Sequence, residues 1–349
     1  MMRSFASDNS APAAPEILQA IVDANDGDAR AYGDDRWTAA AISRVRELFG
    51  ANVEVYFTFN GTAANVLALS SLLRPWEAVL APASAHVNTD ECGALERFAG
   101  VKIVPIATTD GKLRPADLEP YLHHKGVVHY SQPRVISISQ ATEWGSVYEL
   151  EELRELAAFA HANGLLVHCD GARAANAAAA LGVGLRELSA DAGIDVLTLG
   201  GTKNGLLFGE AVVFLKPELH GGAAPFVLKQ AMQLASKMRY VAAQLDALLA
   251  GGRWLRYASH ANAMASRLYE RIAGLDGLRV TRPVRCNAVF ATLPRAAIAA
   301  LQREYEFYVF DEMLPEVRWM THWATGERDV DAFADAITAV LRRNTQGSG

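Results

Sequence analysis

The sequence predicts an α/β fold, in which a large domain with a mainly parallel sheet precedes a smaller C-terminal α/β domain. Three observations support this prediction. Between about residues 53 and 215, short β-rich runs alternate with helical patterns, an order typical of parallel strands joined by crossover helices. Several of these runs are apolar throughout, as expected for strands covered by helices on both faces. After Pro225 the pattern changes to long helical stretches.

The strands expected in the large domain are VEVYFTF (53–59), VLAPA (79–83), VKIVPIA (101–107), RVISISQ (134–140), LLVHCD (165–170), DVLTLG (195–200) and EAVVFL (210–215). Helical patterns separate several of them, in NGTAANVLALSSLL, PADLEPYLHH and ELEELRELAAFAHANG. Gly164 is expected to end the last of these helices, because glycine readily adopts the C-cap conformation. The order of strands and helices is the one that a parallel sheet requires.

The C-terminal part begins with two long helical stretches, 226–252 and 254–275, which Gly251 and Gly252 are expected to separate. The expected elements that follow are the strands LRVTRP and NAVFATL, the helix AAIAALQREY, the strand VRWMTHW and the helix VDAFADAITAVLRR. We therefore expect a domain boundary near residue 250, with a large domain at 1–250 and a small domain at 251–349.

Composition points to an enzyme-sized protein that handles a small molecule. With 349 residues, 51% of them hydrophobic, the chain can bury the cores of both domains. Its net charge of −6 comes without a run of Lys or Arg, so we expect neither nucleic acid nor a membrane as partner. No apolar stretch approaches the roughly 20 residues of a membrane span, and MMRSFASDN does not resemble a secretory signal.

The cysteines fit a reducing cytoplasm. Cys92, Cys169 and Cys286 are odd in number and form no C-x-x-C spacing, so neither a disulfide framework nor a zinc site is expected. The H-E-x-x-H pattern is also absent, and we expect no metal site.

Two side chains with chemical potential follow neighbouring strands. Asp170 ends LLVHCD, and Lys203 lies in the turn G-G-T-K-N-G after DVLTLG, so both stand at carboxyl ends of strands, where open α/β sheets bind ligands. A partly desolvated lysine has a lowered pKa and can form a Schiff base, and an aspartate can pair with a pyridinium nitrogen. Together they predict a pyridoxal phosphate (PLP) site. Either residue alone could instead be a helix cap or a surface turn residue.

The segment N-G-T-A-A-N (60–65) follows a strand and opens a helix. Free backbone N–H groups and the helix dipole at such a position form an anion pocket, which could take a cofactor phosphate. By itself the segment could equally be an ordinary turn and cap. The nucleotide-binding patterns G-x-x-x-x-G-K-[ST] and G-x-G-x-x-G are absent.

Seven short motifs, taken in order, resemble the threonine aldolase family of fold-type I PLP enzymes. They are S-D-N (7–9), A-Y-G-D-D (31–35), N-G-T-A-A-N (60–65), A-H-V-N-T-D-E-C-G (85–93), H-C-D-G-A-R (168–173), G-G-T-K-N-G (200–205) and V-R-W-M-T-H (317–322). The resemblance covers nearly the whole chain. Seven motifs in this order make an accidental match improbable.

The resemblance implies functions for the cofactor-binding residues. Lys203 would be the Schiff-base lysine, and Asp170 would face the pyridine nitrogen. Gly61 and Thr62 would hold the phosphate, and His86 would stack on the cofactor ring.

The resemblance also implies a substrate site and an oligomer. Ser7, Arg173 and Arg318 would bind the substrate carboxylate, with Arg173 also close to the cofactor. Arg239 matches a family arginine that reaches a phosphate in the neighbouring subunit, so a homodimer or homotetramer with shared active sites is expected.

The sequence departs from the family pattern at two positions near the substrate. Glu143, in Q-A-T-E-W-G-S, stands where the family usually has a histidine, and Asp90 replaces an aromatic residue often found four positions after His86. A preference for bulkier or aromatic substrates such as phenylserine is one reading of these changes. For the base that removes the substrate hydroxyl proton we favour His86 over Glu143, because an imidazole titrates near neutrality.

The predicted function is that of an L-threonine aldolase-type lyase, which cleaves β-hydroxy-α-amino acids such as threonine and allo-threonine reversibly to glycine and an aldehyde. The alternatives are a phenylserine aldolase, or another fold-type I enzyme such as a β-eliminating lyase or an aminotransferase, because Lys203 and Asp170 would serve each of these reactions. A non-catalytic scaffold with a coincidental lysine is the alternative from a different class.

Overall fold

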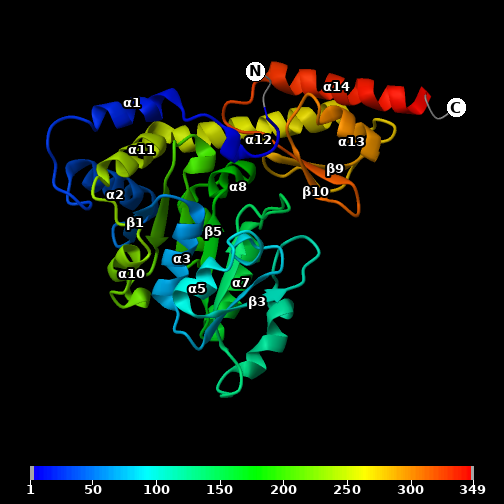
Figure 1. Cartoon of the computed structure of the whole chain (residues 1–349). Coiled ribbons are helices and arrows are strands. Elements are labelled where there is room, and N and C mark those ends of the chain that lie inside the picture. Colours follow the sequence, from blue (N-terminus) through cyan, green and yellow to red (C-terminus); the bar gives the residue numbers. More distant parts are fainter. Residues whose placement is uncertain (1–3, 347–349) are drawn as a thin grey trace.

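The structure, a computed structural model, describes residues 4–346 and contains two sheets (Figure 1). The large sheet has seven strands in the order β1-β7-β6-β5-β4-β2-β3. These strands are β1 (Glu54–Thr58), β2 (Glu77–Pro82), β3 (Lys102–Ile106), β4 (Gln132–Ser139), β5 (Leu166–Gly171), β6 (Val196–Gly200) and β7 (Glu210–Phe214). All are parallel except β7, which is antiparallel to its neighbours β1 and β6. The predicted α/β fold with a mainly parallel sheet is confirmed.

Helices cover both faces of the large sheet. They are α1 (Pro15–Asp23), α2 (Arg36–Phe49), α3 (Gly61–Leu72), α4 (His86–Thr89), α5 (Ala94–Ala99), α6 (Pro115–Leu118), α7 (Leu150–Ala162), α8 (Ala174–Leu181), α9 (Leu185–Leu188), α10 (Ala224–Gln230) and α11 (Arg239–Leu249). Successive strand residues point to opposite faces: on β7, Val213 packs into the core beneath α2, α7, α8 and α11, whereas Val212 and Phe214 pack into the core beneath α3, α5 and α10. Strands buried on both faces explain why the sequence reads as continuous apolar runs.

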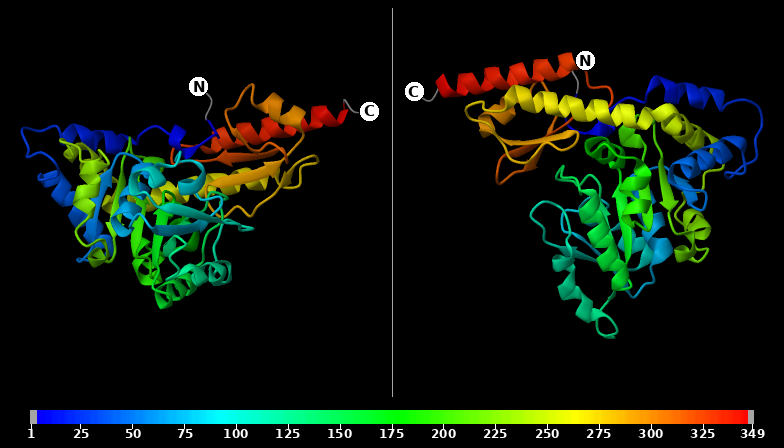
Figure 2. Two further views of the ribbon diagram at one scale, coloured as in Figure 1. Left: turned by 60° about the horizontal axis from the view of Figure 1, so that its bottom comes forward. Right: turned by 180° about the vertical axis from the view of Figure 1, so that it is seen from behind.

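The small sheet has the order β10-β11-β9-β8 and is antiparallel. Its elements are α12 (Arg253–Ile272), β8 (Arg279–Val280), β9 (Ala288–Thr292), α13 (Arg295–Leu301), β10 (Tyr308–Asp311), β11 (Glu316–Met320) and α14 (Glu327–Gln346). Figure 2 shows α12 and α14 side by side, and Arg267 on α12 donates to Asp331 on α14 at 2.8 Å. The edge strand β10 was not predicted.

The expected continuous helix over 226–252 is wrong, because the chain leaves the helix between α10 and α11. Met232 adopts a left-handed conformation (φ 64°). Tertiary contacts hold the break: the N–H of Tyr32 donates to Ser236 O at 2.9 Å, and the Gln233 side chain accepts from the N–H of Phe59 at 3.0 Å. A helical pattern in the sequence cannot reveal such distant partners.

The domain boundary near residue 250 stays a prediction. The helix α12 contributes to the core of the large sheet with Trp254 and to the core of the small sheet with Leu268. Phe5 also packs into the core of the small sheet. None of the helices within residues 4–346 is long and apolar enough to cross a membrane.

Candidate active site

The carboxyl edge of the large sheet brings polar side chains from neighbouring strands together. In the sheet register, Ser139 on β4 pairs with Asp170 on β5, and Asp170 pairs with Thr198 on β6. Lys203 follows β6 in a short 3₁₀ turn, Thr202–Asn204. Because β5 and β6 are parallel, Asp170 and Lys203 stand at the same edge of the sheet.

Asp170 has enough hydrogen-bond donors to stay ionised. Asn65 on α3 donates through Nδ2 to its Oδ2 at 2.9 Å, and the N–H of Ala172 donates to its Oδ1 at 3.0 Å. Desolvation opposes ionisation, but these hydrogen bonds and the Lys203 charge outweigh it and lower the pKa of Asp170. The end of β5 therefore holds an anion that can pair with a cationic ring nitrogen.

The turn that carries Lys203 requires glycine. A Cβ atom on Gly201 would lie 2.7 Å from the carbonyl oxygen of Gly209, and the Gly201 N–H donates to Glu210 Oε2 at 2.6 Å. Burial lowers the pKa of Lys203, and the nearby Arg173 charge lowers it further. The amine is thus more readily neutral and nucleophilic than that of an exposed lysine.

The start of α3 has the features of an anion site. The Asn60 side chain accepts from the N–H of Ala63 at 2.9 Å, which fixes the first turn. The N–H groups of Gly61 and Thr62 precede the first possible intrahelical bond, so they remain available to a ligand. A Cβ atom on Gly61 would meet no atom within 4 Å, so space is open beside it.

A cavity of 580 Å³ opens at this edge of the sheet, between the two sheets of the protein. Its lining residues are Ser7, Asn9, Ser84, His86, Thr89, Asp90, Glu143, Trp144, Arg173, Lys203, Tyr308, Val309, Phe310 and Arg318. This set includes six of the predicted site residues, namely Ser7, His86, Glu143, Arg173, Lys203 and Arg318, together with Asp90, one of the two departures from the family pattern. Gly61, Thr62, Asp170 and Arg239 are not among the lining residues.

The guanidinium of Arg173 is already held by a buried carboxylate. Arg173 donates from Nε and Nη2 to Asp8 at 2.7 and 2.9 Å, and the side chain of Asn287 donates to Asp8 at 3.1 Å. Burial acts against the charge of Asp8, but Arg173 and Lys203 lower the Asp8 pKa to about 2. Asp8 therefore engages the Nε side of the Arg173 guanidinium, and the remaining N–H groups are left for a ligand.

Arg318 on β11 offers a charge that is less fully satisfied. Its Nε is buried and has no hydrogen-bond partner within the described part of the chain. Its guanidinium lies over the ring of Phe310, 5.6 Å from the centroid. Burial, with the Arg173 charge, lowers the pKa of Arg318. Two guanidinium groups that repel each other beside one cavity form a site suited to an anion such as a carboxylate.

His86 and Glu143 meet at the cavity wall. Glu143 Oε1 accepts from the backbone N–H of His86 at 2.9 Å and from Ser139 Oγ at 2.6 Å, whereas Oε2 is buried and has no partner among residues 4–346. Burial raises the pKa of Glu143. The hydrogen bond that the His86 ring donates to Glu91 raises the pKa of His86. Both side chains therefore hold a proton more tightly than they would in water, and the preference for His86 as the base stays a prediction.

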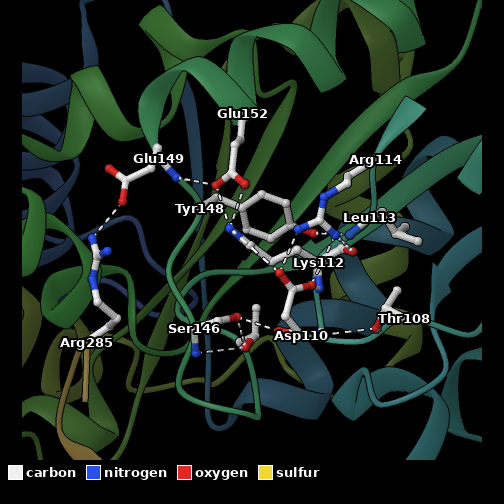
Figure 3. A network of polar contacts seen from close by, with 12 residues as sticks. Thr108, Asp110, Lys112, Leu113, Arg114, Ser146, Tyr148, Glu149, Glu152 and Arg285 are labelled. Atoms are coloured by element: carbon white, nitrogen blue, oxygen red, sulfur yellow. Dashed lines mark hydrogen bonds and ion pairs between the residues drawn. The ribbon is translucent and has the colours of Figure 1, made fainter. Parts of the chain in front are cut away.

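The loop 142–149, which carries Glu143, is held by ion pairs on its far side. Figure 3 shows Lys112 paired with Glu152 at 2.6 Å. It also shows Glu149 of the loop paired with Arg285, from the segment before β9, at 2.7 Å. Glu152 on α7 also accepts from the N–H of Glu149 at 2.8 Å, so the end of the loop is attached both to α7 and to the segment before β9.

A second cavity of 320 Å³ borders this loop, and Trp144 lines both cavities. Arg282 lies over the Trp144 ring, 4.6 Å from the centroid, and is paired with Glu316 at 2.9 Å. Lys112 and Arg285 at the same cavity are also paired with carboxylates. Within residues 4–346, each of these three cations at the second cavity has a carboxylate partner, whereas Arg318 at the first cavity forms no ion pair.

Arg239 lies at the start of α11, and the same chain does not bring it to the cavity. It donates from Nη1 to Gly27 O at 2.9 Å and lies over the rings of Trp37 and Tyr240. If Arg239 contacts a cofactor phosphate, that phosphate would therefore have to be bound in another subunit.

Sequence reasoning missed several residues that shape the site. Asp8, Asn65 and Glu91 stand inside quoted motifs, so their positions within S-D-N, N-G-T-A-A-N and A-H-V-N-T-D-E-C-G were the available signal. Phe310 gave no signal, because the strand that carries it was not predicted.

Comparisons with known proteins identify relatives of the chain in sequence and in fold. The family of beta-eliminating lyases matches residues 4–295. Low specificity L-threonine aldolases of Pseudomonas sp. (strain NCIMB 10558) and Pseudomonas aeruginosa are each 45% identical to the chain, over 97% of it and 98% of their own length. The structure of a Leishmania major threonine aldolase matches with a TM-score of 0.91 and 31% identity, covering 97% of this chain and 99% of that one. An aspartate aminotransferase of Rhodobacter sphaeroides, with a TM-score of 0.69 and 18% identity, shares the fold.

The mainly parallel sheet, with a lysine and an aspartate at adjacent strand ends, is the arrangement of fold-type I PLP-dependent lyases. The chain belongs to the beta-eliminating lyase family. Within it, the chain groups with the threonine aldolases, which confirms the resemblance seen in its seven motifs.

Proposed function

We propose that this protein is an L-threonine aldolase-type lyase that uses PLP to cleave β-hydroxy-α-amino acids, such as threonine and allo-threonine, to glycine and an aldehyde, and that also catalyses the reverse reaction. One observation carries the proposal: Lys203, with a lowered pKa, and the ionised Asp170 stand at one sheet edge, beside a cavity that also holds Arg173 and Arg318. The full-length similarity to low specificity L-threonine aldolases supports it.

The residues present fit PLP at each end of the cofactor. Lys203 would bind its aldehyde carbon, Asp170 would pair with the ring nitrogen, and His86 would stack on the ring. Gly61 and Thr62 would hold the phosphate with the free N–H groups of α3. When bound, PLP supplies an electron sink for the electron pair released when the Cα–Cβ bond breaks.

The chain's own residues would orient the substrate and move one proton. Arg318, with Arg173 and Ser7, would bind the carboxylate, and this contact would set the direction of the Cα–Cβ bond relative to the ring. His86, or alternatively Glu143, would take the proton from the β-hydroxyl as the aldehyde leaves.

We also propose that the active unit is a homodimer or homotetramer with shared sites. Large apolar side chains stand exposed where α10 begins and ends: Phe226 is 78% exposed and Met232 72%. A hollow of 310 Å³ lies beside them, lined by Pro225 and Leu228 among others. Exposed apolar surface of this kind favours a protein partner, and Met238, which precedes Arg239 in the sequence, also lines the hollow.

The cytoplasm is the compartment we propose for this activity. Cys169 and Cys286 are buried free thiols, and Cys92 is an exposed one. Free thiols persist where the surroundings are reducing.

A second candidate is cleavage of aromatic substrates such as phenylserine. Trp144, Tyr308 and Phe310 line the cavity, and rings prefer to pack against other rings. The remaining rivals, β-elimination and transamination, use the same Lys203 and Asp170.

Incubation of the PLP-loaded protein with L-threonine, L-allo-threonine and phenylserine separates these functions. We expect glycine and the matching aldehyde from at least one threonine isomer, and a higher kcat/KM for phenylserine if the aromatic wall sets the preference. Consumption of a keto acid, or release of ammonia and a keto acid, without glycine would contradict the proposed function.

A further inference from the structure

A partly buried chain of hydrogen bonds connects His86 with Asp170 at the candidate cofactor site. His86 Nδ1 lies 2.8 Å from Glu91 Oε1, and Asn65 donates from Nδ2 to that same oxygen at 2.8 Å. Asn65 Nδ2 also donates to Asp170 Oδ2 at 2.9 Å. One amide nitrogen therefore serves two carboxylates, of which one faces His86 and the other lies at the end of β5.

Glu91 is an unusual residue at this depth. Its side chain is fully buried, and Oε2 has no hydrogen-bond partner within residues 4–346. Burying a carboxylate is unfavourable unless donors compensate it. The donors present are Asn65 and the His86 ring, so Glu91 depends on His86 as much as His86 depends on Glu91.

We propose that Glu91 is a positioning residue, which holds the ring plane and the tautomer of His86 so that Nε2 serves the substrate cavity. An ionised Glu91 accepts a hydrogen bond from Nδ1–H, which keeps the proton of a neutral imidazole on Nδ1 and leaves the free electron pair on Nε2. The inference rests on the proposed function, in which His86 takes the hydroxyl proton. It assigns a role to a residue that was not among the predicted site residues.

The same contact controls when His86 can act as a base. The groups that face His86 are Glu91, Asp170 and Lys203, while Glu143 binds its backbone N–H. The Glu91 hydrogen bond raises the pKa of His86 most strongly, burial opposes it, and Lys203 lowers it. Since a base must be deprotonated, cleavage should rise with pH through the pKa of His86.

The test replaces Glu91→Gln, which keeps the shape but removes the charge. NMR titration of the His86 ring in the holoenzyme and in the apoprotein should show a lower pKa than in the wild type, because the charge of the partner is lost. Glu96→Gln, at an exposed position on α5, is the matched control and should leave the His86 pKa unchanged. An unchanged His86 pKa in Glu91→Gln would overturn the proposal.

Kinetics give the second measurement. Glycine release should fall about 10- to 100-fold in kcat, the range found when a group that orients a metal-binding histidine is removed, with a small change in KM. The acid limb of the kcat profile should move to lower pH, and exchange of the glycine α-proton should be retained. Parallel loss of cleavage and exchange would mean that Glu91 only supports the fold, and would also overturn the proposal.

Glu91→Asp keeps the test decisive if the glutamine variant does not fold. The shorter carboxylate cannot keep both contacts, so the His86 pKa should fall here too, and an unchanged value counts against the proposal. If the wild type releases no glycine from any β-hydroxy amino acid, the proposed function fails, whereas the NMR result still tests the contact between Glu91 and His86.

Discussion

At the scale of single residues, the two cavity arginines are not equivalent. Asp8 occupies the Nε and Nη2 groups of Arg173, whereas Arg318 keeps a buried Nε without a partner in the described chain. A buried donor left unpaired is unfavourable, so a substrate carboxylate that satisfies it gains binding energy. We therefore propose that Arg318 is the principal ligand of the substrate carboxylate. Arg173 would add positive charge to the cavity and help to orient the carboxylate.

Arg318→Lys tests this distinction, because a point charge replaces a planar fork. We expect KM for amino acids to rise about 10- to 100-fold, which corresponds to the ~1.5–3 kcal/mol of a charge-assisted hydrogen bond. The absorbance of the lysine-bound cofactor should be preserved. Unchanged affinities for glycine and for substrate, measured by titration, would assign Arg318 to another role.

Asp170→Asn should retain PLP but lose activity. A neutral amide no longer favours the protonated ring nitrogen, and protonation of that nitrogen makes the cofactor an electron sink. We expect kcat to fall about 100- to 10,000-fold, the range of a positioned proton or charge partner. Steady-state kinetics at equal cofactor occupancy measure the effect, and near-wild-type turnover would remove Asp170 from this role.

Lys203→Ala should abolish covalent attachment of the cofactor. Lys203 is the lysine that lines the cavity, and its lowered pKa favours a nucleophilic amine. Borohydride reduction followed by peptide mass analysis should find PLP on Lys203 in the wild type and on no lysine in the variant. A reduced adduct on a different lysine would show that the assignment is wrong.

At the scale of elements, the sequence predicted what depends on local pattern and missed what depends on distant partners. The apolar runs of β4 to β7 revealed strands buried on both faces. The break between α10 and α11 was missed, because Phe59 and Tyr32 hold it from far along the chain. Asp8 was missed as a ligand of Arg173 because 165 residues separate the two. His86 and Lys203 could be identified because each lies in a family motif. The spacing of residues in the sequence could not show which atoms the two side chains face.

Glu210, the first residue of β7, makes the stability of the protein depend on pH. Burial raises the pKa of Glu210 from its ordinary value of 4.5 to about 7. The folded state then binds a proton more tightly than the unfolded state, so stability is lost as pH rises from 4.5 through about 7. Because glutamine does not titrate, the Glu210→Gln variant should not lose stability in this way as the pH rises. Its advantage in free energy of unfolding over the wild type should grow by on the order of 3 kcal/mol across that window and stay constant above it.

Urea unfolding at several pH values across the window measures this change. Glu218→Gln, at an exposed glutamate of the following segment, is the control and should follow the wild type at every pH. A difference between Glu210→Gln and the wild type that does not vary with pH would contradict the titration of Glu210.

At the scale of the whole molecule, the N-terminal segment joins the two sheets at the active site. The N–H of Phe5 donates to Glu306 O at 2.9 Å in the small-sheet part, and the N–H of Ala14 donates to Gly205 O at 2.8 Å beside the Lys203 turn. Between them, Asp8 bonds both Arg173 and Asn287. The proposed carboxylate site is therefore assembled from three distant parts of the chain, and its geometry depends on the position of the small sheet relative to the large one.

Mixed dimers of two inactive variants can test the proposed sharing of active sites between subunits. If Arg239 completes the phosphate site of a partner, Lys203→Ala inactivates the site of its own subunit, whereas Arg239→Ala impairs the site of the neighbouring subunit. In a mixed dimer, the site built on the intact Lys203 receives an intact Arg239 from the other subunit, so about half of the wild-type activity should return. Each variant alone should stay impaired.

Mixing Lys203→Ala with Asp170→Asn is the control, because both residues come from one subunit and no intact site can form. Absence of recovery in confirmed mixed dimers of the first pair, or equal recovery in the control, would mean that Arg239 acts within its own subunit.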